Sequence, residues 1–238
     1  MLLQCFVIIA CQPFVYVLTS QVCLCHKKPP LKILLPQNVT QHCGVKQLTR
    51  TAAILDNDDI VSVDAIIVCT GYGKSFPFLH KDCHLTVSKE NRVTPLYKHI
   101  IHTEFPTLIF IGVPVNTPTA FHMFTVQVKF AMATLDGTMI LPCREVMDDD
   151  TDKDYQRRLS LKMSPLHAHS MERRFFWDYI YSLAALAGCE VPSRAVKALS
   201  DHNLVIMFAD VLNFREKEYR IDNEDTFTEV ERRCKMII

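Results

Sequence analysis

The segment Val63–Leu79, VDAIIVCTGYGKSFPFL, constrains the fold more than any other part of the chain. Its run Ala65–Thr70 is apolar or nearly so and ends at Gly71, a pattern typical of a strand buried on both faces and followed by a tight turn. In open α/β sheets, ligands bind at the carboxyl ends of parallel strands. The segment therefore predicts an α/β fold with a ligand site around Thr70, Gly71 and Tyr72. An ordinary strand followed by a glycine turn is the alternative.

A second apolar run, Thr107–Val113, predicts another buried strand. Its Gly112 would let a ligand or another backbone approach closely, because glycine has no side chain. We expect this strand to form the second wall of the same site.

A helix is predicted from Thr117 to Gly137, with proline at its first position and glycine as its stop. Gln127 lies off its apolar stripe, so helical spacing alone predicts that this side chain is exposed. The last third of the chain is also predicted to be helical, and one of its helices would be capped by Ser170 and stopped by Gly188. The predicted core face of the first helix consists of Phe124, Val128, Ala131 and Leu135.

Composition excludes several classes of protein. With 238 residues, 49% of them hydrophobic, the chain can bury a sizeable core in one or two domains. Lys+Arg and Asp+Glu both total 26, so the zero net charge gives no electrostatic argument for binding nucleic acid. The ten cysteines are scattered through apolar segments, which favours reduced, buried thiols over a disulfide framework.

No metal site is predicted. Cys23, Cys25 and His26 form a C-x-C-H motif, but His42 and Cys43, the nearest partners downstream, are adjacent and not spaced as a second zinc-binding pair.

The alternating aspartates of residues 148–154 resemble the start of a calcium loop, but Lys153 and Leu159 stand where that loop needs glycine and glutamate. We interpret them as a solvated helix face. The histidines at 99 and 102 and at 167 and 169 do not have the spacing of a zinc protease helix, and no catalytic residue is assigned.

The phrase D-x-I-I-x-C-T-G-Y followed by F-P-F-L resembles the segment by which flavin-containing monooxygenases return from their NADP-binding domain to their FAD-binding domain. Other pieces in matching order extend the resemblance, over about residues 14–230, to the second half of an insect-type member. They include LPQNVTQ, VTPLYKHII, IGVP, LPCREVM and YRIDNEDTFTEV.

This resemblance implies an α/β flavoprotein with two Rossmann-like dinucleotide-binding domains and a helical C-terminal third. Residues 1–70 would be a remnant of the NADP-binding domain, and residues 71–238 the C-terminal segment of the FAD-binding domain. The implied activity is oxygenation of soft nitrogen or sulfur in a small-molecule amine or sulfide, as in dimethylaniline monooxygenases that form N-oxides and S-oxides. The implied cofactors are FAD and NADPH, and the residues placed near them are Thr70, Gly71, Tyr72, Gly112 and Gln127.

The glycine content limits what the resemblance implies. Such folds hold each dinucleotide with a G-x-G-x-x-G turn, because glycines let the backbone approach the pyrophosphate. The chain has six glycines, and its sole G-x-G, Gly71 and Gly73, is followed by Phe76 where the third glycine belongs. We therefore expect a truncated chain that binds FAD poorly by itself. A non-catalytic remnant, which binds a partner but no flavin, is the alternative.

The amino terminus leaves the localisation open. Met1–Leu18 is strongly apolar and reaches the lower limit of a membrane span, but no positive charge precedes it and no cleavage motif follows. The resemblance instead implies that Phe14–Leu18 is a buried strand of the NADP-binding half. We expect a cytoplasmic or endoplasmic-reticulum-associated protein, with weak support for membrane association. Secretion is the alternative if residues 1–20 are a signal peptide.

Overall fold

The computed structural model describes residues 5–10, 21–25, 37–69, 72–210 and 213–230. The chain forms two compact units. The first takes in Met1–Tyr72, His202–Arg220 and Thr228–Ile238, and the second Gly73–Asp201 and Ile221–Phe227. Whether these units correspond to the NADP- and FAD-binding parts stays a prediction.

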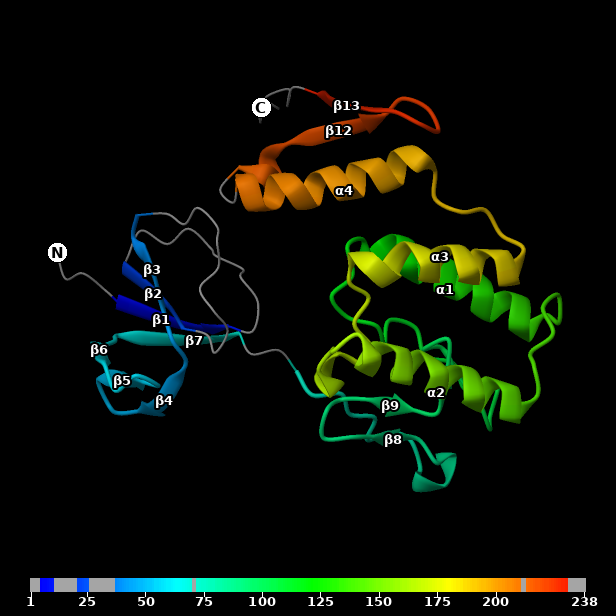
Figure 1. Ribbon diagram of the computed structural model, residues 1–238, viewed down its shortest axis with the longest axis horizontal. Coiled ribbons are helices and arrows are strands. Elements are labelled where there is room, and N and C mark those ends of the chain that lie inside the picture. The colour runs from blue at the N-terminus through cyan, green and yellow to red at the C-terminus, as the bar shows by residue number, and fades with distance from the viewer. Residues whose placement is uncertain (1–4, 11–20, 26–36, 70–71, 211–212, 231–238) are drawn as a thin grey trace, which may run out of the picture. The chain divides into compact units, whose positions relative to one another are not determined.

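The first unit contains a four-stranded parallel sheet in the order β3-β2-β1-β7 (Figure 1). Its strands are β1 (Cys5–Ala10), β2 (Gln21–Cys25), β3 (Val39–His42) and β7 (Ala65–Cys69). Parallel neighbours need a connection that crosses over the sheet, so this arrangement is typical of α/β folds. The prediction of a strand at Phe14–Leu18 lies outside the described residues.

β7 confirms the strand predicted at residues 65–70, but the prediction that it is buried on both faces is wrong. Ile67 is 40% exposed and Val68 is 65% exposed. Among the described residues β7 pairs only with β1, so it is the edge of the sheet and its outward side chains lack cover.

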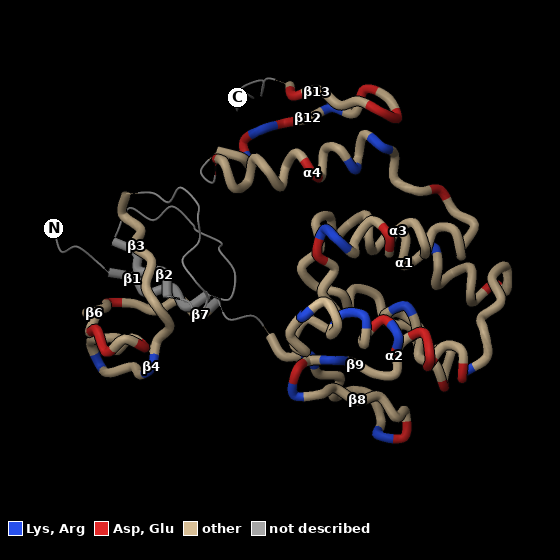
Figure 2. The backbone as a smooth tube through the Cα atoms, viewed as in Figure 1, with Lys and Arg blue, Asp and Glu red and all other residues tan. Residues whose placement is uncertain are grey.

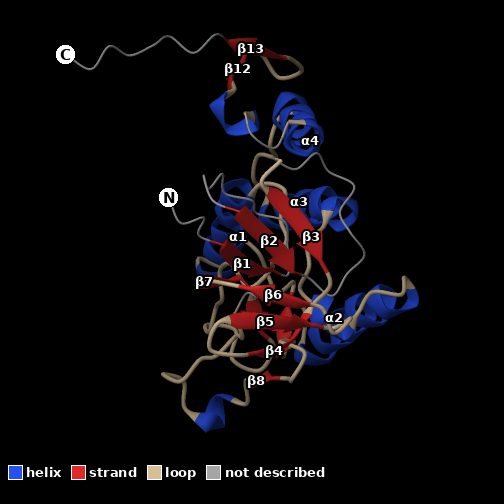
Figure 3. Cartoon of the chain, turned by 90° about the vertical axis from the view of Figure 1, so that its left-hand side faces the viewer, coloured by secondary structure: helices blue, strands red, loops and turns tan. Residues whose placement is uncertain are grey.

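A small antiparallel sheet lies between β3 and β7 in sequence (Figure 3). Its strands are β4 (Val45–Leu48), β5 (Ala52–Leu55) and β6 (Ile60–Ser62). Ala53 and Leu55 are fully buried, and Ile66 of β7 is among the partly buried residues that pack on them. The meander therefore covers part of one face of β7.

Short hairpins begin the second unit. After the 3₁₀ turn Lys81–Cys83, β8 (Thr86–Val87) pairs with β9 (Val93–Thr94), and β10 (Leu96–Tyr97) pairs with β11 (Ile101–His102). The backbone reverses between β10 and β11 at Lys98 and His99, which both have positive φ angles. This turn sets the direction of the Lys98 carbonyl, which accepts a hydrogen bond from the Tyr179 hydroxyl.

Helices make up most of the rest of the second unit. They are α1 (Ala120–Leu135), α2 (Arg144–Ser160) and α3 (Arg173–Ala187), with a 3₁₀ turn at Pro165–His167. α4 (Arg194–Ala209), a 3₁₀ turn at Phe214–Glu216 and a hairpin of β12 (Glu218–Ile221) and β13 (Phe227–Val230) complete the described chain. Of the described helices, none combines the length and apolarity that crossing a membrane requires.

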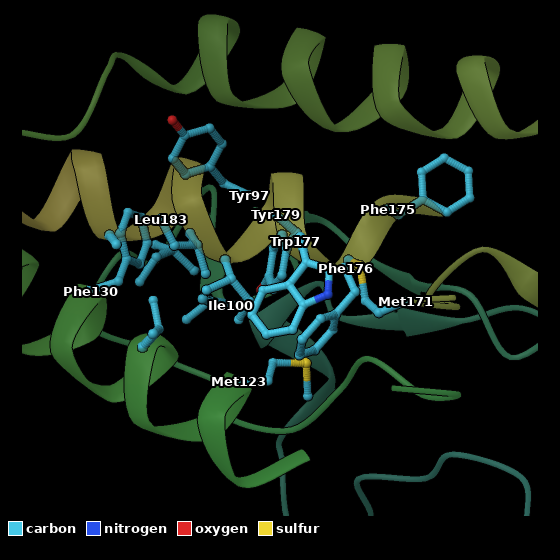
Figure 4. Close-up of a cluster of buried hydrophobic side chains, with 14 of the residues drawn as sticks. Tyr97, Ile100, Met123, Phe130, Met171, Phe175, Phe176, Trp177, Tyr179 and Leu183 are labelled. Atoms are coloured by element: carbon cyan, nitrogen blue, oxygen red, sulfur yellow. The ribbon is translucent and has the colours of Figure 1, made fainter. Parts of the chain in front are cut away.

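The main hydrophobic core lies between α1, α3 and the β10–β11 hairpin. Met123 and Phe130 of α1 face Phe176 and Leu183 of α3, and Ile100 of the hairpin lies among them (Figure 4). All five side chains are fully buried. Burial of a large apolar side chain contributes roughly 1.5–3 kcal/mol, so this cluster is a main source of the unit's stability.

The prediction of a second strand, at Thr107–Val113, is wrong. Only an isolated antiparallel bridge joins Ile109 to Ile101, and two backbone hydrogen bonds, from His102 to Leu108 and from Phe110 to Ile100, attach the segment to the hairpin. The strand beside it, β11, is only two residues long, and the positive φ of Gly112 turns the chain away. Its apolar side chains still contribute to a hydrophobic core cluster, in which Phe110 and Val113 are buried.

The helix predicted to end at Gly188 is confirmed as α3, whose C-cap Gly188 is left-handed with φ 59°. Ser170 does not cap it, since the N-cap is Glu172. Ser170 is fully buried and forms a parallel bridge with Val115. It therefore joins two loops of the second unit.

Candidate functional site

Of the predicted cofactor residues, the structure brings Gly112 and Gln127 together. The Gly112 N–H donates a hydrogen bond of 3.0 Å to Oε1 of Gln127. Tyr72 is 99% exposed and belongs to the first unit. Thr70 and Gly71 lie outside the described residues, so their predicted role stays a prediction.

Gly112 occupies a position that other residues fit badly. Its φ is +84°, in the region that favours glycine, and a Cβ there would lie 3.2 Å from Cε1 of Phe124. The sequence predicts that the missing side chain admits a ligand or a backbone. On the Cβ side it admits the Phe124 ring of α1 instead. Glycine therefore lets the turn pack against the first turns of the helix.

The prediction from helical spacing that Gln127 is exposed is wrong, because its side chain is fully buried. Both polar atoms of the Gln127 side-chain amide form hydrogen bonds. Oε1 accepts from the Gly112 N–H, and Nε2 donates to Oη of Tyr179 over 2.8 Å. The predicted core face is wrong in part: Val128 and Leu135 are about half exposed, whereas Ala131 is buried. α1 is rotated so that the side carrying Gln127 faces α3.

The start of α1 offers hydrogen-bond donors next to the Gly112 turn. The N-cap, Thr119, makes no side-chain capping bond, and its Oγ1 is buried without a partner among the described residues. The first turn carries no acidic side chain. Free N–H groups and the positive end of the helix dipole suit an anionic group such as a pyrophosphate or the electron-rich edge of a flavin.

A flavin dinucleotide fits these residues only in part. The Gly112 turn and the start of α1 can supply one wall, but the Gly112 N–H itself is already bonded to Gln127. No G-x-G-x-x-G turn is present in the sequence to cradle the pyrophosphate.

Two histidines that the sequence analysis set aside form a buried network with Asp154 of α2. His99 Nδ1 and His169 Nδ1 are 2.8 Å apart, and His99 Nε2 lies 3.3 Å from Asp154 Oδ2. The Val93 N–H donates to His169 Nε2 over 2.8 Å. His169 Nε2 is therefore unprotonated, so its Nδ1–H donates to His99 Nδ1, and the remaining His99 proton, on Nε2, donates to the carboxylate. The sequence holds no signal for this pair, whose members are 70 residues apart.

The electrostatics keep both histidines neutral. Burial lowers the pKa of His169 to about 2 and lowers that of His99 as well, and the nearby ammonium of Lys74 adds to both effects. Burial also lowers the pKa of Lys74, to about 8. For Asp154, burial alone would raise the pKa, but hydrogen bonds from His99 and Arg158 outweigh it and hold the pKa well below its usual range.

Acidic residues recur along α2 (Figure 2). The aspartates predicted to form a solvated face are exposed or partly exposed, and they also pair with basic side chains. Asp150 accepts from Lys98 over 2.7 Å and Asp152 from Arg92 over 3.0 Å. Asp154 also accepts from Arg158, whose side chain is almost fully buried. These ion pairs attach α2 to the segment that contains β9 and to the turn that follows β10. No group of metal-ligating side chains occurs within the described part of the chain.

A cavity of about 390 Å³ lies within the second unit, between α2, α3 and the turn after β10. Its lining includes Lys98, His99, Asp154, Arg158 and Tyr179. Neither Gly112 nor Gln127 lines it. The cavity therefore adjoins the histidine network and not the Gly112 turn.

Comparison with solved structures identifies known proteins that share this fold. S-allyl-L-cysteine S-oxygenase from Allium sativum superposes with a TM-score of 0.72 over 90% of this chain and 51% of its own, at 23% identity. Tmm from Pelagibacter sp. strain HTCC7211 gives a TM-score of 0.72 over 96% of this chain and 52% of its own, at 18% identity. The mixed α/β fold is that of these proteins.

The sequence matches the flavin-binding monooxygenase-like family over residues 18–214, and the chain belongs to this family. Curated relatives include two flavin-containing monooxygenases of Arabidopsis thaliana. FMO GS-OX3 is 33% identical over 68% of this chain and 35% of its own length, and FMO GS-OX1 is 36% identical over 59% of this chain and 31% of its own. The chain spans about one third of the length of these relatives.

Proposed function

We propose that this protein takes part in FAD- and NADPH-dependent oxygenation of a soft sulfur or nitrogen atom in a small molecule. The observation that carries the proposal is the family match over residues 18–214, which covers both the Thr70–Tyr72 segment and the Gly112 turn. The matched relatives are flavin-containing monooxygenases by name.

Two details of the proposal concern the cofactors. In this proposal, residues 1–70 belong to an NADP-binding domain and residues 71–238 belong to an FAD-binding domain. Bound FAD, once reduced by NADPH, would supply the chemistry that activates oxygen. The chain's own contribution is to place the Gly112 turn and the start of α1 along the flavin and to exclude water there with Phe124 and neighbouring apolar side chains.

We also propose that this polypeptide holds FAD weakly by itself. Its sequence lacks a G-x-G-x-x-G turn, and one donor of the proposed wall, Gly112 N–H, is engaged by Gln127. The alternative, a partner-binding protein without flavin, differs in one measurable respect, because it would show no saturable flavin binding at any concentration.

For the substrate we favour sulfur over nitrogen. One solved neighbour is an S-oxygenase of S-allyl-L-cysteine by name. A small alkyl sulfide is therefore the first substrate to test, with a tertiary amine beside it.

The test is sulfide-dependent NADPH oxidation with S-oxide quantified as product, at an FAD concentration raised until the rate stops increasing. We expect S-oxide to form in proportion to NADPH consumed, and only when FAD is supplied. No NADPH oxidation at any FAD concentration would favour the non-catalytic alternative. NADPH oxidation without S-oxide or N-oxide would instead contradict oxygenation of these substrates.

A further inference from the structure

A chain of three hydrogen bonds, one buried and two partly buried, connects α3 to the Gly112 turn. The Gly112 N–H donates to Gln127 Oε1 (3.0 Å), Gln127 Nε2 donates to Tyr179 Oη (2.8 Å), and Tyr179 Oη donates to the Lys98 carbonyl (2.9 Å). Gln127 is fully buried and Tyr179 is 9% exposed. Water therefore has little access to the central hydrogen bond, between Gln127 and Tyr179.

Only one arrangement of protons satisfies this chain. The Lys98 carbonyl can only accept, so Tyr179 must give it the single hydroxyl proton. Tyr179 then accepts from the amide of Gln127, which leaves Oε1 as the end that faces Gly112. The tyrosine hydroxyl thus favours the same amide orientation as the Gly112 N–H, which can only donate, and helps to hold Oε1 against Gly112.

Neighbouring contacts hold the Lys98 end of this series of hydrogen bonds in place. Lys98 and His99 have positive φ angles of 50° and 60°. The turn is tied to α2 by an ion pair from Lys98 to Asp150 and by the hydrogen bond from His99 to Asp154. His169 also bonds to His99. The Lys98 carbonyl is therefore a fixed acceptor, and burial raises the pKa of Tyr179, so its hydroxyl stays protonated at neutral pH.

We propose that Tyr179 is a positioning residue which, acting through Gln127, sets the conformation of the Gly112 turn at the proposed flavin wall. The inference rests on the proposed function for its connection to flavin, but its structural part can be tested without flavin. Tyr179 acts from α3 and makes no direct hydrogen bond to Gly112.

The test is amide hydrogen exchange at Gly112, measured by NMR relative to the amide of Phe110, which bonds to the Ile100 carbonyl and not to Gln127. Tyr179→Phe removes the hydroxyl alone. We expect the ratio of Gly112 to Phe110 exchange rates to rise about 10-fold, as for loss of one buried hydrogen bond. Tyr181→Phe is the matched control, because it makes the same change on the same helix at a hydroxyl that has no hydrogen bond among the described residues. There the ratio should not change.

Gln127→Asn provides a second variant, since its amide is one methylene too short to reach both partners, and it should raise the ratio in the same way. If Tyr179→Phe leaves the ratio unchanged, the proposal is wrong. If Tyr179→Phe unfolds the chain while Tyr181→Phe does not, the role is purely structural and the proposal is also wrong.

Flavin binding separates this inference from the proposed function. Where the native chain binds FAD, Tyr179→Phe should raise the Kd several-fold and Tyr181→Phe should not. If the native chain binds no FAD, the proposed function fails, yet the exchange ratio still decides whether Tyr179 positions the turn.

Discussion

At the residue scale, Gly112 combines a positive φ with close packing against Phe124. Gly112→Ala should therefore lower the free energy of unfolding by about 2 kcal/mol, part from backbone strain and part from the contact with the ring. Urea unfolding measures the change.

Gly137→Ala is the control for this prediction. Gly137 has a similar φ of +79°, but a Cβ there would meet no atom within 4 Å. Gly137→Ala should lower the free energy of unfolding by about 1 kcal/mol, from backbone strain alone. Equal losses for the two variants would contradict a role for the Phe124 contact.

The buried histidines predict how stability depends on pH. Their pKa values are lowered in the folded chain, so below pH 6.5 the unfolded chain binds protons that the folded chain does not. The free energy of unfolding should be unaffected by this pair above pH 6.5. It should fall as the pH decreases from 6.5 to 4.5, by up to about 1.4 kcal/mol per pH unit for each histidine.

His169→Gln should flatten this pH dependence, which is measured by urea unfolding at a series of pH values. His80→Gln is the control, because His80 is exposed. A slope below pH 6.5 that is equally steep in native and His169→Gln chains would show that the histidine network is not its source.

At the scale of elements, α2 is attached to the second unit by its charged residues more than by apolar ones. Its buried residues are Met147 and Arg158, and Arg158 pairs with Asp154 and donates to the Ser170 carbonyl. Removing one partner of a largely buried pair leaves the other charge without compensation.

Asp154→Asn should therefore destabilise the chain by about 2–3 kcal/mol, a figure reduced because the carboxylate is partly exposed. The matched change Asp149→Asn, on the same helix, removes an exposed pair with Lys153 and should leave the unfolding midpoint unchanged. Thermal unfolding followed by circular dichroism compares the two. A similar shift for both would contradict the attachment of α2 through Asp154.

Elements with local signals were predictable. β7 follows from the apolar run that ends at residue 70, and α3 from its apolar face and Gly188. The segment 107–113 has an equally apolar sequence but forms only an isolated bridge, because its neighbour β11 is two residues long and the length of a partner strand is not encoded locally.

The candidate site was predictable only in part, for the same reason. Gly112 could be singled out as a glycine in an apolar run, but the burial of Gln127 depends on Tyr179, which lies 52 residues further on. The His99–His169 pair likewise spans 70 residues. Spacing along one helix carries no information about such partners.

At the scale of the whole molecule, the chain combines membership of a flavin-binding family with an incomplete set of cofactor contacts. The match to flavin-binding monooxygenases covers residues 18–214, while the described residues supply the Gly112 turn and the start of α1 as one wall for flavin. Weak but saturable binding of FAD is what these two findings together predict.

The most direct test is a fluorescence titration of the purified 238-residue chain with FAD, together with the visible absorption spectrum of the protein as purified. We expect a colourless protein that binds FAD saturably with a Kd well above micromolar, and more weakly still in Gly112→Ala. A protein that purifies yellow with stoichiometric flavin would contradict weak binding. A titration with no saturation would contradict the flavin site itself.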